Sequence, residues 1–96
     1  MRLALVTCLA LLPTTTLAAN PDCAIMGGIV DRIVAERVEG TEMMAAMEAV
    51  AAEYTGDQER FVGTIPHLTD WVYNGLPKEH LTAEAGQAFA TQCAAQ

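Results

Sequence analysis

The two cysteines near the ends of the chain constrain its fold more than any other feature of the sequence. Cys23 and Cys93 are 70 positions apart, so a bond between them encloses nearly all of a domain that begins near residue 20. In the chain-entropy model, closing a loop of this length removes about 4 kcal/mol of conformational freedom from the unfolded state. The pair predicts a fold whose first and last segments lie together, provided that the cysteines reach an oxidising compartment.

The N-terminal segment predicts such a compartment. Residues 1–19 have the order of a secretory signal peptide, with a positive charge at the start, an apolar run over 3–12 and small residues at the end. The apolar run is about half as long as a membrane-spanning helix requires, and Pro13 with three threonines interrupts it. We expect cleavage after Ala18 or, preferably, Ala19, and a product located in the periplasm or secreted.

Removal of the signal peptide also removes Cys8 and leaves Cys23 and Cys93, an even count in an oxidising compartment. Such a count indicates one disulfide bond. The alternative is a pair of free thiols, but the sequence has no Cys-x-x-Cys motif and places no further ligands beside them. Neither Cys8 nor Cys23 follows the small residues of a lipoprotein cleavage site, so we expect a soluble product without a lipid anchor or membrane insertion.

Size and charge exclude several kinds of partner. Residues 20–96 form a chain of about 77 residues, enough for one small domain in the range where a disulfide is a usual support. Four basic residues stand against twelve acidic ones, a formal charge of −8. This balance disfavours nucleic acid and anionic lipid as partners. A basic protein partner and ordinary solubility both account for it.

A first helix is expected from Asn20 to about Glu39. Asn20 is a good N-cap, Pro21 suits the first helical position, and apolar residues recur at a spacing of four. The adjacent Gly27 and Gly28 cost about 1 kcal/mol each relative to alanine in a helix. Close packing of another helix explains the two glycines better than a hinge does.

A second helix is expected from Glu42 to about Tyr54, with Thr41 as its N-cap. Met43 and Met47 lie on its apolar face. Because methionine packs adaptably against different surfaces, this face is a possible interaction surface. A place in the core is the simpler interpretation.

Shorter patterns follow along the chain. The expected elements are one helical turn within 57–63, a third helix after the cap Thr64 that closes at Gly75, and a last helix over 83–94 after the cap Thr82. Trp71 and Tyr73, near the end of the third helix, form an aromatic pair of the kind found at binding hot spots. For Trp71, the only tryptophan, a role as a core anchor is the simpler interpretation.

Together these elements predict an all-α fold, a small antiparallel bundle of about four helices closed by one disulfide. Short connections favour antiparallel neighbours. In an up-down-up-down order, the start of the first helix and the end of the fourth lie at the same end of the bundle. Cys23 and Cys93 stand at these two places, so the local pattern and the cross-link agree.

Residues for catalysis are scarce. His67 and Asp70 are three positions apart and could share a metal, but two ligands make no site. His80 stands in a connector, serine is absent, and the remaining cysteines are assigned to the disulfide. Paired glutamates such as Glu36 with Glu39 are typical of solvated helix faces. We therefore expect no enzymatic activity, no metal and no cofactor.

A resemblance covers nearly the whole of residues 20–96. The positions that carry it are Cys23 at a helix start, Arg37 to Gly40 at its end, Trp71 to Tyr73, Leu81 with Thr82, and Cys93. With these features the chain resembles small exported helical proteins of Gram-negative bacteria that have a terminal cysteine pair, which implies a helical fold but no established activity. It is also similar to the periplasmic acid-stress chaperones in being small, helical, exported and cross-linked once, although their cysteines enclose a shorter loop.

These observations favour a non-catalytic module that binds a protein partner of unknown identity and is itself a monomer or a weak homo-oligomer. The alternative is an acid-activated periplasmic chaperone. Below about pH 4 the carboxylates become protonated and the histidines charged, so the net charge moves from −8 toward +6. Repulsion between like charges could then open the bundle.

Overall fold

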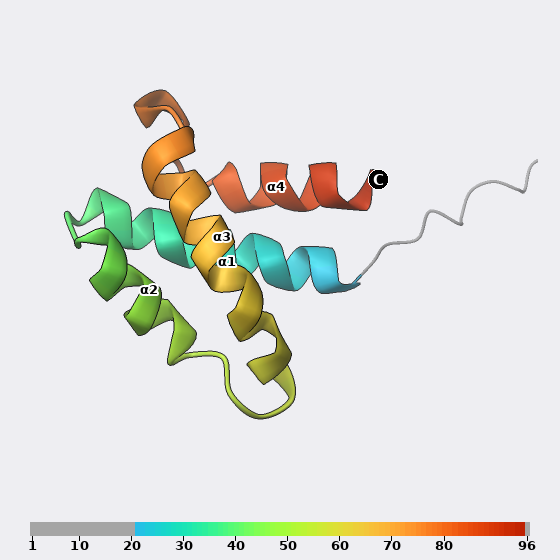
Figure 1. Ribbon diagram of the computed structural model, residues 1–96. Coiled ribbons are helices and arrows are strands. Elements are labelled where there is room, and N and C mark those ends of the chain that lie inside the picture. The colour runs from blue at the N-terminus through green and yellow to red at the C-terminus, as the bar shows by residue number, and fades with distance from the viewer. Residues whose placement is uncertain (1–20, 96) are drawn as a thin grey trace, which may run out of the picture.

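The computed structural model describes residues 21–95, and these residues form helices and turns without a strand (Figure 1). The four α-helices are α1 (Pro21–Val38), α2 (Met43–Ala51), α3 (Ile65–Asp70) and α4 (Ala85–Ala94). Three shorter helical segments are η3 (Gly56–Thr64), η4 (Trp71–Gly75) and η5 (Lys78–His80). The all-α class and the count of about four helices are confirmed for this part of the chain. The expected signal peptide and its cleavage site lie outside the described residues.

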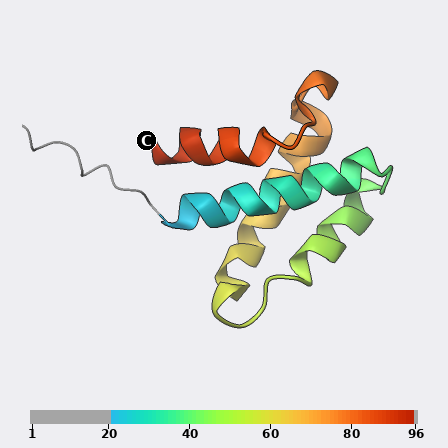
Figure 2. The same cartoon turned by 180° about the vertical axis from the view of Figure 1, so that it is seen from behind.

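Helix α1 is the element around which the others pack. It contacts α2, α3, η4 and α4, and Figures 1 and 2 show α4 beside it and α3 crossing it. Asp22 in its first turn and Arg37 in its last complement the helix dipole. The helix ends at Val38, and the turn that follows includes Gly40, whose φ of 89° is readily adopted by glycine. In this C-cap, the amide of Thr41 donates to the Glu36 carbonyl over 2.9 Å.

Helix α2 begins one residue later than expected, with a different cap. Glu42 is the N-cap, and its carboxylate accepts from the amides of Met44 and Ala45 over 3.0 and 3.2 Å. The prediction of Thr41 as the cap was therefore wrong. A glutamate can reach the amides of the first turn as a shorter cap does, and its charge suits the positive end of the helix dipole.

The segment from η3 to η4 is helical throughout but changes type twice. It begins as a 3₁₀ helix, becomes an α-helix at Ile65 and ends as a π-helical turn at Trp71–Gly75. The expected single turn within 57–63 is therefore part of a longer 3₁₀ segment. Thr64 stands at the expected start of α3, but its hydroxyl donates back to the Phe61 carbonyl over 2.8 Å instead of capping the helix.

The last helix also begins later than expected, at Ala85 rather than residue 83. The hydroxyl of Thr82 accepts from the Glu84 amide over 3.2 Å, which closes a turn just before the helix. Thr82 thus caps that turn rather than α4. In the first turn of α4, the Gly86 amide donates to Asp31 of α1.

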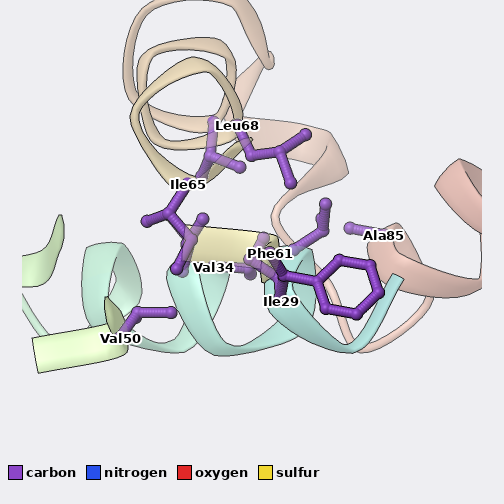
Figure 3. Close-up of a cluster of buried hydrophobic side chains, with 10 residues drawn as sticks. Ile29, Val34, Val50, Phe61, Ile65, Leu68 and Ala85 are labelled. Atoms are coloured by element: carbon purple, nitrogen blue, oxygen red, sulfur yellow. The ribbon is translucent and has the colours of Figure 1, made fainter. Parts of the chain in front are cut away.

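The core lies where α1 meets α2, α3 and η4 (Figure 3). Its largest fully buried apolar side chains include Ile29 and Ile33 of α1 and Ile65 of α3. Burying such a side chain contributes about 1.5–3 kcal/mol. The further members of the cluster are Val30, Val34, Val50, Phe61, Leu68, Val72 and Ala85. Since η3, α3 and α4 each supply only one or two of these buried residues, their positions depend on α1.

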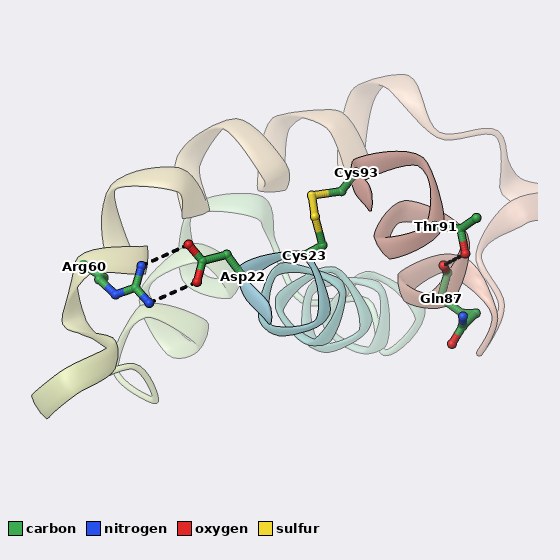
Figure 4. The surroundings of a disulfide bond; sticks show 6 residues. All are labelled: Asp22, Cys23, Arg60, Gln87, Thr91 and Cys93. Carbon is green, nitrogen blue, oxygen red and sulfur yellow. Dashed lines mark hydrogen bonds and ion pairs between the residues drawn. A yellow bond between two sulfur atoms is a disulfide. The ribbon is translucent and has the colours of Figure 1, made fainter. Parts of the chain in front are cut away.

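The two ends of the described chain are joined as expected. The sulfur atoms of Cys23 and Cys93 are bonded at 1.95 Å (Figure 4). Further along the same pair of helices, Gly27 faces Gly86 so closely that a Cβ on Gly27 would lie 2.6 Å from the Gly86 carbonyl oxygen. Cys23 in the first turn of α1 is bonded to Cys93 near the end of α4. Gly27, four residues later in α1, faces Gly86, which stands seven residues earlier in the chain than Cys93. Close helix packing at Gly27 is confirmed, whereas Gly28 has nothing within 4 Å of such a Cβ.

Candidate binding groove

A largely apolar groove of about 500 Å³ lies between α4 and the end of the α3–η4 segment. Its apolar lining comes from Leu68, Trp71, Leu76, Ala85, Ala88 and Phe89, and its polar lining from His80, Thr82, Glu84 and Gln92. Its volume is in the range of ligand-binding clefts, about 300–1,000 Å³. The groove is therefore the candidate functional site.

One wall of the groove is a continuous face of α4. Ala85, Ala88, Phe89 and Gln92 are spaced by three, four and seven positions, which places them on one side of a helix. The distance from the first to the last is about 10 Å along the axis, since each residue adds about 1.5 Å. This wall contains no charged side chain, because α4 from Ala85 to Ala94 has none.

The start of this wall is fixed by a residue of α1. The Gly86 amide donates to the Asp31 carboxylate over 2.9 Å, although the two residues are 55 positions apart. Glu84 occupies the N-cap position of α4, but its side chain makes no capping hydrogen bond. Asp31 of α1 therefore caps α4 in place of Glu84. The Glu84 carboxylate, which has no capping role, lies in the groove lining.

The opposite wall is formed where the chain leaves α3. The Leu76 amide donates to the Trp71 carbonyl over 2.8 Å, the five-residue spacing of a π-helical turn. A Cβ on Gly75 would lie 3.2 Å from Cδ1 of the Trp71 indole, so the glycine leaves room for the ring. Single π-helical turns occur often at functional sites, and this one places Trp71 and Leu76 in the groove lining.

Arg37 of α1 supports the π-helical turn from behind. Its Nη1 donates to the carbonyls of Val72 and Leu76, the second over 3.1 Å. The Tyr73 hydroxyl donates to the Thr41 carbonyl over 2.7 Å, and partial burial raises the pKa of this phenol. Since both contacts connect η4 to the end of α1, they hold the groove wall in place.

Two aromatic rings connect the walls. The centroids of Trp71 and Phe89 are 5.9 Å apart, with the ring planes tilted by 48°. This separation is in the favourable range for aromatic pairs. Trp71 is nevertheless 37% exposed, so its indole is available to a ligand in the groove. As the only tryptophan, it is also a spectroscopic reporter at the site.

The residues predicted as an interaction surface are divided by the fold. Trp71 lines the groove, and Tyr73 lies on the same turn but is hydrogen-bonded toward α1. Met43 contacts the Asn74 amide nitrogen, 3.8 Å from its sulfur, and Met47 packs against the core. The structure therefore brings only the first of the four residues to the candidate site.

Sequence reasoning missed most of the groove lining. Neither Leu68 nor Phe89 was singled out as a site residue, and His80 was interpreted as a connector residue. The available signal was a combination: apolar residues at 85, 88 and 89 on the last helix, together with an apolar Leu76 in a connector. That combination indicates a groove only when the path of the connector is known.

The residues considered for metal binding do not line the groove. His67 and Asp70 are both exposed, and the Asp70 carboxylate accepts from the Asn74 amide over 2.7 Å. Within residues 21–95, no group of three or more histidine, cysteine, aspartate or glutamate side chains is placed to hold a metal ion. No helix among these residues has the length and apolar character of a membrane span.

Surface ion pairs connect α1 with the end of α2 and with η3. Arg32 of α1 pairs with Glu53 just after α2, at 2.7 Å, and with Glu36 at 3.1 Å. Arg60 of η3 pairs with Asp22 over 3.0 Å (Figure 4). These hydrogen bonds lower the pKa of Glu53 and of Asp22 below their ordinary values. The pKa of Glu36 is also lowered, first by a hydrogen bond from Thr41 and then by Arg32.

Comparison of the chain with protein-family models, with curated proteins and with solved structures gives no match. The function of the chain is therefore inferred from the groove and from the charges around it.

Proposed function

We propose that this protein is a non-catalytic binding module that receives an amphipathic helix of a partner protein in the groove. The observation that carries the proposal is the groove itself, an apolar hollow of about 500 Å³ with Trp71 and Phe89 in its lining. Aromatic side chains at such places dominate the binding energy of many interfaces.

The shape of the groove favours a helix as the occupant. Its α4 wall presents side chains at positions 85, 88, 89 and 92, over about two helical turns. A partner helix that lies in a groove is recognised by apolar side chains at the same spacing. Since α4 has no charged side chain, a helix packed along it removes no charge of this wall from water.

The proposal is tested with a designed peptide of about fifteen residues, built from leucine, alanine and glutamine in an amphipathic helical pattern. The peptide has no aromatic residue, so the fluorescence of Trp71 reports on the protein alone. We expect a saturable shift of the emission when the oxidised protein is titrated. A scrambled peptide of the same composition should give none.

Variant Ala88→Glu tests whether the groove is the binding site. Ala88 lines the groove and is exposed, so a bound helix would cover the new carboxylate without a partner. We expect at least tenfold weaker binding, because desolvating an unpaired charge is costly. The control is Ala49→Glu on the exposed side of α2, with the same change in net charge. Unchanged binding by Ala88→Glu, with helicity retained, would show that the groove does not bind the peptide.

The second candidate is an acid-activated chaperone, and the ion pairs favour it. The pKa values of Asp22 and Glu53 are lowered in the folded state, so their contribution to stability is present above their unfolded values near 4. It is lost as the pH falls through the lower folded values. Acid thus weakens the contacts that hold η3 and α2 on α1, while the disulfide is unaffected.

This alternative is tested by taking the oxidised protein from pH 7 to pH 3 while helicity, dye binding and suppression of client aggregation are followed. An acid-activated chaperone exposes apolar surface and protects the client at pH 3. An unchanged structure that gives no protection eliminates this candidate and leaves the peptide-binding proposal intact.

Export completes the proposal. Residues 1–19 would serve as the signal peptide, and residues 20–96 would act in the periplasm or outside the cell, where the disulfide is stable. We also propose an antiparallel order of the four helices. Mass spectrometry of the exported protein tests the cleavage site directly, with an N-terminus at Asn20 expected and one at Met1 contradicting it.

A further inference from the structure

We infer that the helix received by the groove is cationic, with a lysine or arginine that lies beside Glu84 when the apolar face is seated. This inference rests on the proposed function and adds the charge of the partner. Three observations support it: Glu84 lies at the groove, the lining has no lysine or arginine, and the arginines of the described residues already have partners within the fold.

Glu84 is a carboxylate that the fold places at the groove without using it. It immediately precedes the α4 wall, lines the groove and is exposed. The amide that an N-cap side chain would accept from, that of Gly86, donates to Asp31 instead. Within residues 21–95, the Glu84 side chain is not part of an ion pair. It is therefore available to a positive group on a ligand.

The lining has no lysine or arginine that would attract a negatively charged partner. Its titratable side chains are Glu84 and His80. Lys78 of η5, the only lysine in the sequence, does not belong to the lining. A partner helix with glutamate beside Glu84 would place like charges together, whereas lysine there gives an attractive pair.

The three arginines of the described chain are already engaged within the fold. Arg32 pairs with two glutamates, Arg60 pairs with Asp22, and Arg37 donates to backbone carbonyls. A surrounding surface with many more carboxylates than cations steers a positive partner toward the protein. The local carboxylate at Glu84 then determines where the positive charge of the partner lies.

The test compares three peptides of one amphipathic helical pattern, with lysine, glutamine or glutamate at the polar positions, monitored through Trp71 fluorescence. We expect the lysine peptide to bind most tightly and the glutamate peptide least tightly. Variant Glu84→Gln should weaken the lysine peptide about two- to fivefold, the effect of one exposed ion pair. The glutamine peptide should be weakened less, because it places no positive charge beside Glu84.

Variant Glu48→Gln is the matched control, because it removes the same charge from an exposed position on α2. An equal weakening by Glu84→Gln and Glu48→Gln would show attraction by net charge alone and overturn the inference. The glutamine peptide would still bind in that case, so the proposed function would stand. If the glutamine peptide also fails to bind, the proposed function itself is wrong.

Discussion

The two sides of α1 are held in different ways. On one side, α4 is attached by the Cys23–Cys93 bond, by the backbone contact of Gly27 with Gly86 and by the Asp31 cap. On the other side, α2 and η3 combine a few buried residues, such as Val50 and Phe61, with ion pairs at the surface. The α4 side forms one wall of the groove, whereas the side of α2 and η3 includes ion pairs that depend on pH and ionic strength.

The difference teaches how a small domain keeps a binding groove in place. A covalent bond and a backbone contact do not depend on ionic strength, so the α4 wall is kept in position under many conditions. Ion pairs between exposed side chains contribute little and are screened by salt. The α4 wall of the groove therefore depends on the α1–α4 contacts, whereas acid or salt acts on the ion pairs at the surface of α2 and η3.

The largest expected effect is that of reducing the disulfide. Reduction keeps both cysteine side chains and removes only the cross-link, so the free energy of unfolding should fall by about 2–4 kcal/mol. Denaturant unfolding of the oxidised and reduced protein measures this change. Amide exchange should increase more in α4 than in α2. A uniform increase over both would contradict the distinction between the two sides.

The next largest effect is expected for Gly27→Ala. The added Cβ would meet the Gly86 carbonyl oxygen at 2.6 Å and the Ala90 Cβ at 3.1 Å, so the helices must move apart. Overpacking of this kind costs about 1–3 kcal/mol. Thermal unfolding measures it, with Gly28→Ala as the neighbouring control. The control should be neutral or stabilising, since nothing lies within 4 Å of its Cβ and alanine favours a helix.

A smaller effect is expected for Asp31→Ala, which removes the partner of the Gly86 amide. Loss of a capping group costs about 1 kcal/mol. Asp31→Asn should lose less, because its carbonyl oxygen can still accept. The comparison of the two variants by chemical denaturation separates the hydrogen bond from the charge, and equal losses would show that the bond is not the stabilising feature.

The smallest effect concerns pH. The pKa of Asp22 is lowered by Arg60, so the stabilisation from this pair is lost as the pH falls below about 4. Arg60→Gln should therefore make the decrease of stability between pH 5 and pH 2 less steep, as measured by unfolding at each pH. Lys78→Gln, a change of the same charge in η5, is the control. Identical profiles for the two variants would argue against a specific role of the pair.

Much of the fold could be predicted because its signals are local. Proline at the first helical position, apolar residues at a spacing of four and glycine at position 40 indicate where α1 begins and ends. The cysteine pair identified which ends meet. The close contact at Gly27 was expected from the cost of a glycine inside a helix.

The remaining features depend on contacts between distant residues. The π-helical turn at Trp71–Gly75 is supported by Arg37, and the start of α4 by Asp31. No local pattern reports these partners, which are 39 and 55 positions away. The groove lies between the same two elements, so Trp71 could be proposed as an interaction residue from the sequence, whereas its neighbours Phe89 and Leu76 could not be assigned to the same site.

The central claim, that the groove between α4 and the η4 turn is the binding site, is tested most directly by NMR. The oxidised protein, labelled with ¹⁵N, is titrated with the glutamine peptide, and backbone and indole shifts are followed. The account predicts that the changes gather at Leu68, Trp71, Leu76 and the 84–92 segment, with α2 nearly unaffected. Changes centred on the methionine face of α2, or no change at the Trp71 indole when the peptide is bound, would contradict it.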